Sequence, residues 1–559
     1  MISNALGTAN TPRAHMNNRA AMDCLRDIGL WEECAKVGHG GKYIMHYRWC
    51  ETLAGEEYAR NYSWGFGDRA GDYVNASPCH HLDLPQSVLE PILLRYATTN
   101  GFKARFDTEF LSFKEDKASG KTICLVQDKV TGVQYQIATK YLFGADGGRS
   151  KIVKQLGFPM TVVPGGGIAY NVLVNVELGH LMENRQGNLH WCMRLYKDYP
   201  FLVVARMVKP WHQWMFVVLP KGPQVPEQTF TYEEWAEIVK DCIGDGDDVD
   251  VEVVDVSKWI INETSADVVS KGNIFCLGDA IHRHPPTLGL GSNTCIQDSF
   301  NLSWKISLVL KGIASPSILD TYNVERQPIA AELVRLSNDK LRAHIGVWQA
   351  IGIQPPGAPL EQRIATLQTL RSSTPDGKAA RALLKERVRE LYSETAALGI
   401  EMGQFYNSTV VYANDEPQPF AKTGREADDP QQFYEPCTYP GRRLPHVWLN
   451  TPVPGKLVST IDIAGKGRFC LITGMGGEAW KVAAKQVQEE LGVPIHAVAI
   501  GRALDWEDTY LSWDDRKGVE EDGAVLVRPD LFVAWRAQTS GDEEAKLGKV
   551  MKSLLGLKA

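Results

Sequence analysis

The sequence predicts an α/β protein with α+β elements, in which a ligand-binding body is interleaved with a separate β-sheet and followed by a small α/β domain. Two short apolar strands, at residues 140–145 and 274–277, run into Asp-Gly and Gly-Asp pairs, as at the ligand-binding edge of an α/β sheet. Between them, residues 168–219 are rich in β-branched and aromatic residues, which favours a second sheet. After a Pro- and Asp-rich stretch at 415–440, strands and helices alternate again.

The first third of the chain alternates helices and strands. Met22, Leu25 and Ile28 recur at helical spacing, and Gly29 favours a stop. A second helix is predicted over residues 85–97. Strand-like runs follow at 101–113, 122–128, 133–138 and 140–145. The last of these leads into Asp146-Gly147 and then into a helix that begins near Ser150.

Later elements show either the alternation typical of strands or the spacing typical of helices. Strands are predicted at 170–176, 189–195, 211–219, 274–277, 469–472, 495–500, 524–527 and 531–535. Helices are predicted at 227–243, from Ser292 or Asn293 to Lys311, through most of 315–398, at 479–491 and at 543–555. The predicted domains are 1–160 and 263–400 for the two parts of the ligand-binding body, 161–262 for the sheet, 401–440 for a linker and 441–559 for the tail.

Composition excludes several function classes. The chain has 559 residues and a formal charge of −7, which would repel nucleic acid and anionic membrane surfaces. No apolar run approaches the roughly 20 residues of a membrane helix, so no membrane span is expected. Eleven cysteines occur without a Cys-x-x-Cys pair and no signal peptide opens the chain, which favours a reduced, cytoplasmic setting.

Residues 278–293 have the composition of a flavin site. Asp279 stands at the end of a strand, where its carboxylate can accept hydrogen bonds from sugar-alcohol hydroxyls. Prolines 285 and 286 fix an extended turn, and the glycines that follow let backbone N–H groups approach a flat ligand. The next helix directs its positive dipole end at that ligand. The alternative is a plain strand-to-helix turn. The predicted flavin contacts here are Gly278, Asp279, Pro286, Gly289, Leu290, Gly291, Ser292 and Asn293.

In their order along the chain, these motifs resemble class A FAD-dependent aromatic hydroxylases. Residues 282–305 most resemble the 2,4-dichlorophenol 6-monooxygenase and phenol 2-monooxygenase branch. Asp146 and Gly147 are similar to the family's Asp-Gly motif, which serves FAD and the nicotinamide cofactor. Gln86 matches a glutamine that contacts the flavin, and Arg13 matches an arginine that reaches the FAD phosphates.

The resemblance implies a para-hydroxybenzoate-hydroxylase-like FAD domain, an interleaved substrate-domain sheet and a C-terminal thioredoxin-like domain. That last domain has only Cys470, so we expect it to support structure or a possible homodimer. The implied reaction uses NAD(P)H and O2 to hydroxylate a small phenolic or related aromatic compound through a flavin hydroperoxide. A flavin oxidase or dehydrogenase, and a flavin-free scaffold, remain alternatives.

His15 is the predicted catalytic residue. By resemblance it lies where phenol hydroxylase has an acidic residue that activates the substrate hydroxyl. A phenol has a pKa of about 10, so an acceptor that favours the phenolate makes the ring more nucleophilic. Purely local hydrogen bonding of His15 is the alternative. The histidine clusters at 79–81 and 282–284 lack zinc-site spacing, so no metal is expected.

The sheet is expected to cover the flavin and to build the substrate pocket. The side chains predicted to do so are Tyr170, His190, Trp191, Arg206, Trp211 and Trp214.

One part of the family's pattern is missing. Its members begin with a strand, a Gly-x-Gly-x-x-Gly loop and a second strand that ends in an acidic residue. Here the chain is predicted to start inside that second strand, with Ser3 at the acidic position, and no Gly-x-Gly-x-x-Gly run stands anywhere in it. Two interpretations stay open: a start-site error in an active enzyme, or a remnant that no longer binds flavin.

Overall fold

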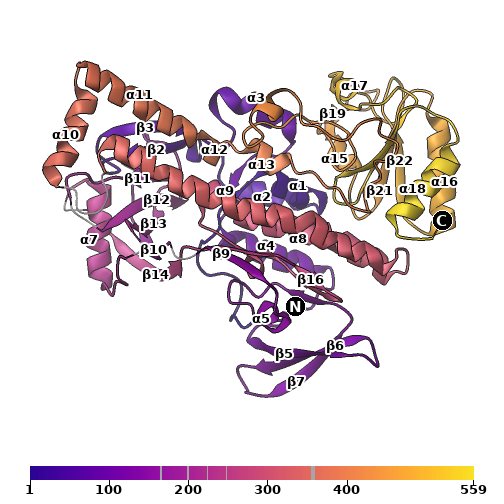
Figure 1. The fold of residues 1–559 in the computed structure, drawn as a ribbon, viewed down its shortest axis with the longest axis horizontal. Helices are drawn as coiled ribbons and strands as arrows, with labels where there is room; N and C mark the ends of the chain where they lie inside the picture. Colours follow the sequence, from indigo (N-terminus) through magenta and orange to yellow (C-terminus); the bar gives the residue numbers. More distant parts are fainter. Residues whose placement is uncertain (164–165, 198–199, 223, 247–248, 354–358, 559) are drawn as a thin grey trace.

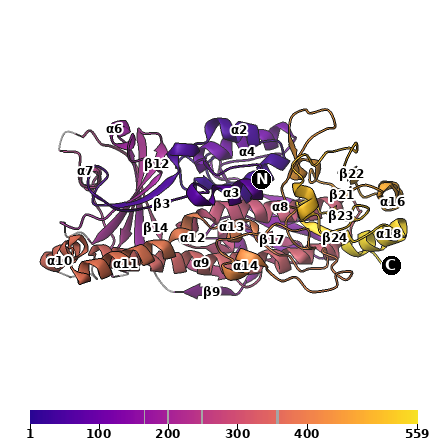
Figure 2. The ribbon, with the colours of Figure 1, turned by 90° about the horizontal axis from the view of Figure 1, so that it is seen from above.

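The computed structural model describes residues 1–163, 166–197, 200–222, 224–246, 249–353 and 359–558. A seven-stranded sheet lies at one end of the molecule, a C-terminal α/β domain lies at the other, and a central body joins them (Figure 1). Seen from above, α9 (Thr321–Ile351) and α11 (Pro375–Glu390) follow one long side, and α2 (Trp31–Val37) and α4 (Gln86–Thr99) lie on the opposite side (Figure 2).

Two short parallel strands organise the central body. In β8 (Leu142–Gly144) and β17 (Ile274–Cys276), Leu142 is in register with Ile274, and the N–H of Leu277 donates to the carbonyl of Gly144 at 3.0 Å. Parallel strands end at the same edge of a sheet, so the segments that follow β8 and β17 lie close together.

Small sheets and helices complete the central body. These elements are β1 (Met16–Asn17), α1 (Arg19–Asp27), α3 (Ala70–Ala76), β4 (Leu82–Asp83), β5 (Thr108–Asp116), β6 (Lys121–Asp128), β7 (Gln134–Thr139), α5 (Lys151–Leu156), β9 (Met160–Val163), β15 (Glu263–Ala266), β16 (Ser270–Lys271) and β18 (His282–Arg283). Strands β5, β6 and β7 form a meander that projects below the rest in Figure 1.

The seven-stranded sheet is larger than the sequence predicted. Its order is β14-β10-β13-β12-β11-β2-β3, and its strands are β2 (His46–Cys50), β3 (Glu57–Tyr62), β10 (Ile168–Asn175), β11 (Leu189–Cys192), β12 (Phe201–Lys209), β13 (Gln213–Pro220) and β14 (Glu252–Ile260). Strand β2 pairs with β11 in parallel, so a segment near the N-terminus extends a sheet whose other strands come much later in the chain.

One face of this sheet is covered by α7 (Tyr232–Ile243), with α6 (Gly179–Met182) beside it. The sequence predicted the longer helix from residue 227. It begins instead at Tyr232, because Thr231 and Glu234 form a capping box that satisfies the first backbone amides.

Helices connect the two ends of the molecule. After α8 (Gly291–Leu310) come α9, α10 (Leu360–Arg371), α11, α12 (Tyr392–Thr395), α13 (Leu398–Met402) and α14 (Gly424–Asp428). The segment 401–440, predicted as a linker, has little regular structure but buries Tyr406, Tyr412 and Tyr434. It therefore contributes to the core.

The C-terminal domain, which the resemblance predicted to be thioredoxin-like, has a four-stranded sheet in the order β22-β21-β23-β24, with β21 and β22 parallel. Its elements are β19 (Trp448–Leu449), β20 (Val458–Ser459), α15 (Thr460–Ile463), β21 (Phe469–Thr473), α16 (Glu478–Leu491), β22 (Ile495–Ala499), α17 (Ser512–Arg516), β23 (Ala524–Val527), β24 (Val533–Ala537) and α18 (Glu543–Leu554). Burial raises the pKa of Cys470 on β21 to about 12, which suppresses the reactive thiolate. Trp304 of α8 packs edge-on against Phe469, so this domain shares a core with the central body.

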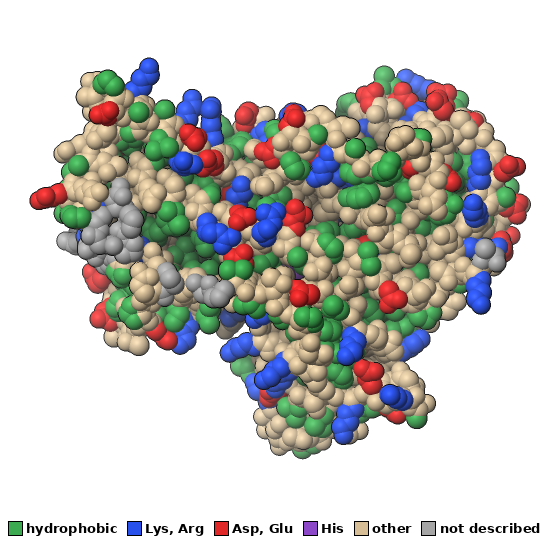
Figure 3. All heavy atoms as spheres, in the orientation of Figure 1, with side chains coloured by type: hydrophobic (Ala, Val, Ile, Leu, Met, Phe, Trp, Pro, Cys, Tyr) green, Lys and Arg blue, Asp and Glu red, His purple; other side chains and the backbone are tan. Residues whose placement is uncertain are grey.

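Charges on the visible surface are mixed in sign. Figure 3 shows basic and acidic side chains interspersed along α9, where Arg335 pairs with Asp339 and Arg342 pairs with Glu263. Within the described ranges, no helix is both long and apolar enough to cross a membrane.

Candidate active site

Backbone hydrogen bonds place the N-terminal loop against the start of α4. The carbonyl of His15 accepts from the N–H of Leu84 at 2.7 Å, and the carbonyl of Ala14 accepts from the N–H of Gln86 at 2.8 Å. Three predicted residues therefore come together here: Arg13, His15 and Gln86. Arg13 is exposed, and Gln86 donates from Nε2 to Glu90 at 2.5 Å.

The same loop is tied to the start of α8 by Asn293. Its Oδ1 accepts from the N–H of Asn18 at 2.9 Å, and its Nδ2 donates to the carbonyl of Met16 at 2.8 Å and to that of Gly289 at 2.6 Å. Asn293 is fully buried. The predicted flavin segment 278–293 thus lies directly against residues 16–18.

The two acidic residues of the predicted motifs occupy one edge of the central sheet. Asp146 and Asp279 are both exposed, just beyond β8 and β17. Asp146 caps α5, because its carboxylate accepts from the hydroxyl of Ser150 at 2.6 Å and from the N–H of Lys151 at 2.8 Å. Gly147, at φ +76°, makes the turn between strand and helix. Arg283 joins the two loops by donating to the carbonyl of Gly148.

The N-terminus of α8 is open to an anionic or strongly polar ligand. It begins at Gly291, one or two residues earlier than predicted, with no side-chain cap and no acidic residue in its first turn. Gly289, at φ +62°, lies so close to Trp64 that a Cβ would come within 3.2 Å of the indole. Of the other predicted flavin contacts in this segment, Gly278 and Leu290 are buried, Ser292 is half-buried and Pro286 is exposed.

Asn17 Oδ1 and Asn18 Nδ2, both beside this helix terminus, are buried and lack a hydrogen-bond partner among the described residues. A buried polar atom without a partner costs about 1–3 kcal/mol, so each is expected to bind water or a ligand. Donors, acceptors and a helix N-terminus together fit the polar edge of a flavin ring. The residues present therefore fit the isoalloxazine half of FAD, while no glycine-rich phosphate loop stands in the sequence for the adenine half.

His15 has a buried carboxylate as its partner. Its Nδ1 lies 2.9 Å from Oδ2 of Asp83, which also accepts from Nδ2 of Asn188 at 2.8 Å. Burial and then the charge of Arg206 lower the pKa of His15, although Asp83 acts in the opposite direction. Burial alone would raise the pKa of Asp83, but His15, Arg206 and Asn188 outweigh it and hold that pKa below its ordinary value. The pair is thus a neutral imidazole beside an ionised carboxylate at neutral pH.

Arg206 reaches this pair from the seven-stranded sheet. Its Nη1 donates to the carbonyls of Pro12 and Arg13, and its Nη2 lies 4.0 Å from Oδ1 of Asp83. Burial lowers the pKa of Arg206 to about 10, so the guanidinium stays charged at neutral pH. A fixed positive charge therefore lies beside His15.

Strand alternation corrects the prediction for the sheet. Arg206 is in register with Leu189 and Met215, whereas His190 is in register with Ala205, one position along, so their side chains leave opposite faces. Tyr170, His190 and Trp214 lie on the face covered by α7, and Trp211 packs at its margin. Of the six predicted side chains, Arg206 and Trp191 face the other way. None of the other five lies on β12 with Arg206, so the register between strands, and not alternation along one strand, separates the two sets.

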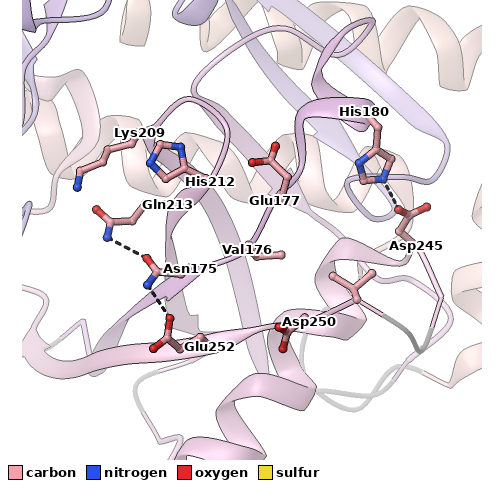
Figure 4. A pocket seen from close by; sticks show the side chains of 11 residues that line it. Asn175, Val176, Glu177, His180, Lys209, His212, Gln213, Asp245, Asp250 and Glu252 are labelled. Carbon is pink, nitrogen blue, oxygen red and sulfur yellow. Dashed lines mark hydrogen bonds and ion pairs between the residues drawn. The ribbon is translucent and has the colours of Figure 1, made fainter.

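A cavity of about 820 Å³ opens at the far end of the sheet (Figure 4). It is lined by polar side chains from α6, the β12–β13 hairpin, the end of β10 and the segment before β14, among them Glu177, His180 and Asp250, and it borders Val176 of the core under α7. None of the predicted flavin or catalytic residues lines it. Because its lining includes neither Arg206 nor the His15–Asp83 pair, we do not place the aromatic substrate there.

The histidine clusters have structural partners. His282 Nε2 lies 3.1 Å from Asp298, and His81 Nε2 lies 3.1 Å from Glu401. Burial lowers the pKa of His284 to about 4, and its Nδ1 is 2.7 Å from the carbonyl of Pro285. Among the described residues, no group of three or more His, Cys, Asp or Glu side chains is placed to hold a metal ion.

Asp83 and Asn188 were missed from the sequence. Asp83 interrupts an otherwise apolar stretch three residues before Gln86, and a carboxylate at such a position was the available signal. Asn188 gave no comparable signal, because its role depends on a contact across 105 residues of chain.

Family models match most of the chain. The FAD binding domain model covers residues 1–337, and the model of the aromatic-ring hydroxylase C-terminal domain covers residues 437–557. Two relatives match nearly all of it. The 2,4-dichlorophenol 6-monooxygenase of Cupriavidus pinatubonensis is 37% identical over 98% of this chain and 91% of its own length. The phenol 2-monooxygenase of a Pseudomonas species (strain EST1001) is 38% identical over 99% of this chain and 88% of its own.

Solved structures show the same architecture. The flavin-dependent monooxygenase PieE, in complex with FAD and substrate, superimposes with a TM-score of 0.93 at 34% identity, covering 100% of this chain and 94% of that one. Aklavinone-11 hydroxylase, with FAD and aklavinone, gives a TM-score of 0.77 at 26% identity, covering 99% and 94%. The chain therefore belongs to the FAD-dependent aromatic-ring hydroxylases, and it is a flavin-dependent aromatic monooxygenase with FAD and NAD(P)H as its cofactors.

Proposed function

We propose that this enzyme hydroxylates a small phenol at a ring carbon next to the existing hydroxyl. The names of the two relatives, a phenol 2-monooxygenase and a 2,4-dichlorophenol 6-monooxygenase, support both the substrate class and the position. The reaction consumes a phenol, O2, NAD(P)H and a proton, and it yields a catechol, NAD(P)+ and water. Bound FAD supplies the activation of oxygen, and the protein positions the ring and excludes water.

The observation that carries the proposal is the hydrogen bond between His15 and Asp83. Because the carboxylate of Asp83 is ionised and can only accept, the proton of the neutral imidazole sits on Nδ1. That leaves Nε2 of His15 as an acceptor for the hydroxyl of a phenol. The nearby charge of Arg206 favours the phenolate, and a phenolate activates the ring carbon beside it.

The remaining predicted residues would hold the cofactor. Asp279 would accept from the ribityl hydroxyls, and Arg13 would contact the phosphates. The amides of Gly291, Ser292 and Asn293 at the start of α8 would stabilise negative charge on the reduced ring. Asp146 and Gly147 form the neighbouring edge, where the nicotinamide cofactor would approach.

The test is a product balance. The FAD-loaded protein is incubated with NADPH and either phenol, 2,4-dichlorophenol or the methyl ether of phenol, which cannot give up a proton. We expect one catechol per O2 and per NADPH with the two phenols, and at least tenfold slower hydroxylation of the ether. Hydrogen peroxide equal to the O2 consumed would favour a flavin oxidase. Hydroxylation of the ether at the rate of phenol would exclude His15 as the proton acceptor.

We further propose that the enzyme works in the cytoplasm as a homodimer. Nine of its eleven cysteines are buried, and all eleven are free thiols, which suits a reducing compartment. Cell fractionation and the mass of the purified protein in solution test the two parts separately.

A further inference from the structure

Asp298 of α8 binds two residues of the flavin loop, which comprises residues 278–282. Its Oδ2 accepts from the N–H of Gly278 at 3.3 Å and lies 3.1 Å from Nε2 of His282. Its side chain is 0% exposed. Both partners belong to residues 278–282, the loop that presents Asp279. The position of this loop therefore depends on where Asp298 is held.

Asp298 is itself held by Arg326 of α9. Nε of Arg326 donates to Oδ1 of Asp298 at 2.8 Å, and its Nη1 donates to Oε1 of Gln404 at 3.1 Å and to the hydroxyl of Tyr406 at 3.0 Å. Arg326 is fully buried. The Tyr406 hydroxyl thus orients the guanidinium on the side opposite Asp298.

Tyr406 connects this arrangement to the C-terminal domain. Its ring stacks on Phe532, with centroids 4.1 Å apart, and the guanidinium of Arg528 lies 5.1 Å from its centre. Arg528 and Phe532 belong to the connection between β23 and β24. A single side chain therefore contacts the C-terminal domain with its ring and the buried arginine behind the flavin loop with its hydroxyl.

Arg528 is anchored independently of Tyr406. It donates to both carboxylate oxygens of Glu325, at 2.6 and 3.0 Å, and to Asp530. Glu325 also accepts from Lys305 at 2.8 Å. Because this ionic cluster fixes the C-terminal domain on α8 and α9, the removal of one hydroxyl from Tyr406 does not release the domain.

We propose that Tyr406 is a positioning residue through which the C-terminal domain holds the flavin loop, residues 278–282, in its binding conformation. The route runs from Phe532 to Tyr406, Arg326 and Asp298, and it ends on the N–H of Gly278. The proposal rests on FAD as the cofactor and not on phenol as the substrate. It gives a role in cofactor binding to a domain that has no redox pair.

The test compares two tyrosines of the same segment. Tyr406→Phe removes the hydroxyl that binds Arg326 and keeps the ring on Phe532. Tyr439→Phe is the matched control, since its hydroxyl donates to the carbonyl of Gln418 at 2.9 Å at the surface. Hydrogen exchange is measured in the flavin-free protein on peptides covering residues 274–283. We expect exchange to rise about fivefold in Tyr406→Phe, which is the size of one typical lost hydrogen bond because Gln404 still accepts from Nη1 of Arg326, and to stay unchanged in the control.

FAD affinity provides the second measurement. Tyr406→Phe should raise the dissociation constant of FAD about fivefold. The urea midpoint of the flavin-free protein should also fall, because Arg326 loses a buried hydrogen bond, and exchange in residues 274–283 compared with exchange in the C-terminal domain separates positioning from general stabilisation. Phe532→Leu, which weakens the contact from the side of the C-terminal domain, should raise loop exchange in the same direction. Arg326→Lys should also loosen the loop, and adding Tyr406→Phe to it should produce little further change, because the hydroxyl acts through the guanidinium.

Hydrogen exchange and the double substitution can each overturn the proposal. Unchanged loop exchange in Tyr406→Phe, or faster exchange confined to the C-terminal domain, would show that Tyr406 only stabilises that domain. Additive effects of Arg326→Lys and Tyr406→Phe would show that they act separately. None of these readouts requires turnover, so a failure to hydroxylate phenols would leave them interpretable.

Discussion

A buried carboxylate fixes the chemical role of His15. Without Asp83, either nitrogen of the imidazole could carry its proton, and the ring could rotate. The 2.9 Å contact at Nδ1 selects the tautomer whose Nε2 accepts. Arg206 then opposes protonation of the ring, because it places a positive charge in the same buried space. The same histidine in an exposed loop would have neither property.

The pH dependence of activity tests this pair. Since the pKa of His15 is lowered from 6.5, we expect kcat/KM to be level above pH 6.5 and to fall only below it. Asp83 raises the pKa of His15, so Asp83→Asn should move the acid limb to still lower pH. The substitution should also reduce the pH-independent value of kcat/KM roughly tenfold or more, because the tautomer of His15 is no longer fixed. An acid limb that moves upward, or does not move, would contradict the assignment.

Among the elements, α8 contributes its first turn to the predicted flavin site and its middle to the protein core. Its first turn is uncapped and faces the predicted flavin position, and the middle of the helix carries Asp298 and Lys305 into the core. The turn before it favours glycine at residue 289, where φ is +62° and a Cβ would lie only 3.2 Å from Trp64. The approach of backbone to ligand is therefore set by the turn before the helix.

Two glycine substitutions separate the cost of a left-handed backbone from the cost of crowding a neighbouring side chain. Gly289→Ala should lower the free energy of unfolding by more than the roughly 1–2 kcal/mol of left-handed strain alone and should weaken FAD binding, because its Cβ would lie 3.2 Å from Trp64 and 3.4 Å from Met16 and would push them aside. Gly312→Ala is the control, since φ there is +72° and no atom lies within 4 Å of the added Cβ. Urea unfolding and FAD titration measure both. Equal effects of the two substitutions would rule out the close approach at residue 289.

At the scale of the whole molecule, α9 joins the two ends. Glu325 near its start binds Arg528 of the C-terminal domain. His344 near its other end lies 2.7 Å from Glu394, and its ring centre lies 4.6 Å from that of Trp191 of the sheet. The central body therefore shares buried contacts with both neighbours. Its stability should depend on the C-terminal domain.

The buried cluster at Glu325 gives the corresponding prediction. Glu325→Gln leaves Arg528 and Lys305 buried with less negative charge, and breaking a buried ion pair costs about 3–5 kcal/mol. We expect a loss of that size in chemical denaturation. Glu332→Gln on the exposed face of the same helix should change stability by less than about 0.5 kcal/mol. A small effect at residue 325 would mean that the cluster is hydrated rather than dry.

The sequence predicted the elements with local signals. The strand before Asp146, the strand before Gly278 and the helix after Gly291 were found because turn residues bound short apolar runs there. The start of α7 was misplaced by five residues, since a capping box at Thr231 outweighs helical spacing upstream. Strands β2 and β3 were missed as members of the large sheet, because β3 pairs only with β2, and β2 joins the sheet through β11, more than 100 residues away.

The sequence by itself determined the α/β class and the alternation of strands and helices in the last domain, and it predicted a flavin segment at residues 278–293, since each depends on residue types at short spacing. Only the tertiary structure decided which side chains share that site. It placed Asp83 on His15 and Arg206 beside them, and it turned Tyr170, His190 and Trp214 to the opposite face of the sheet. Short-range periodicity fixes the direction of each side chain relative to its own strand, whereas the neighbours it meets depend on strand pairing across the whole chain.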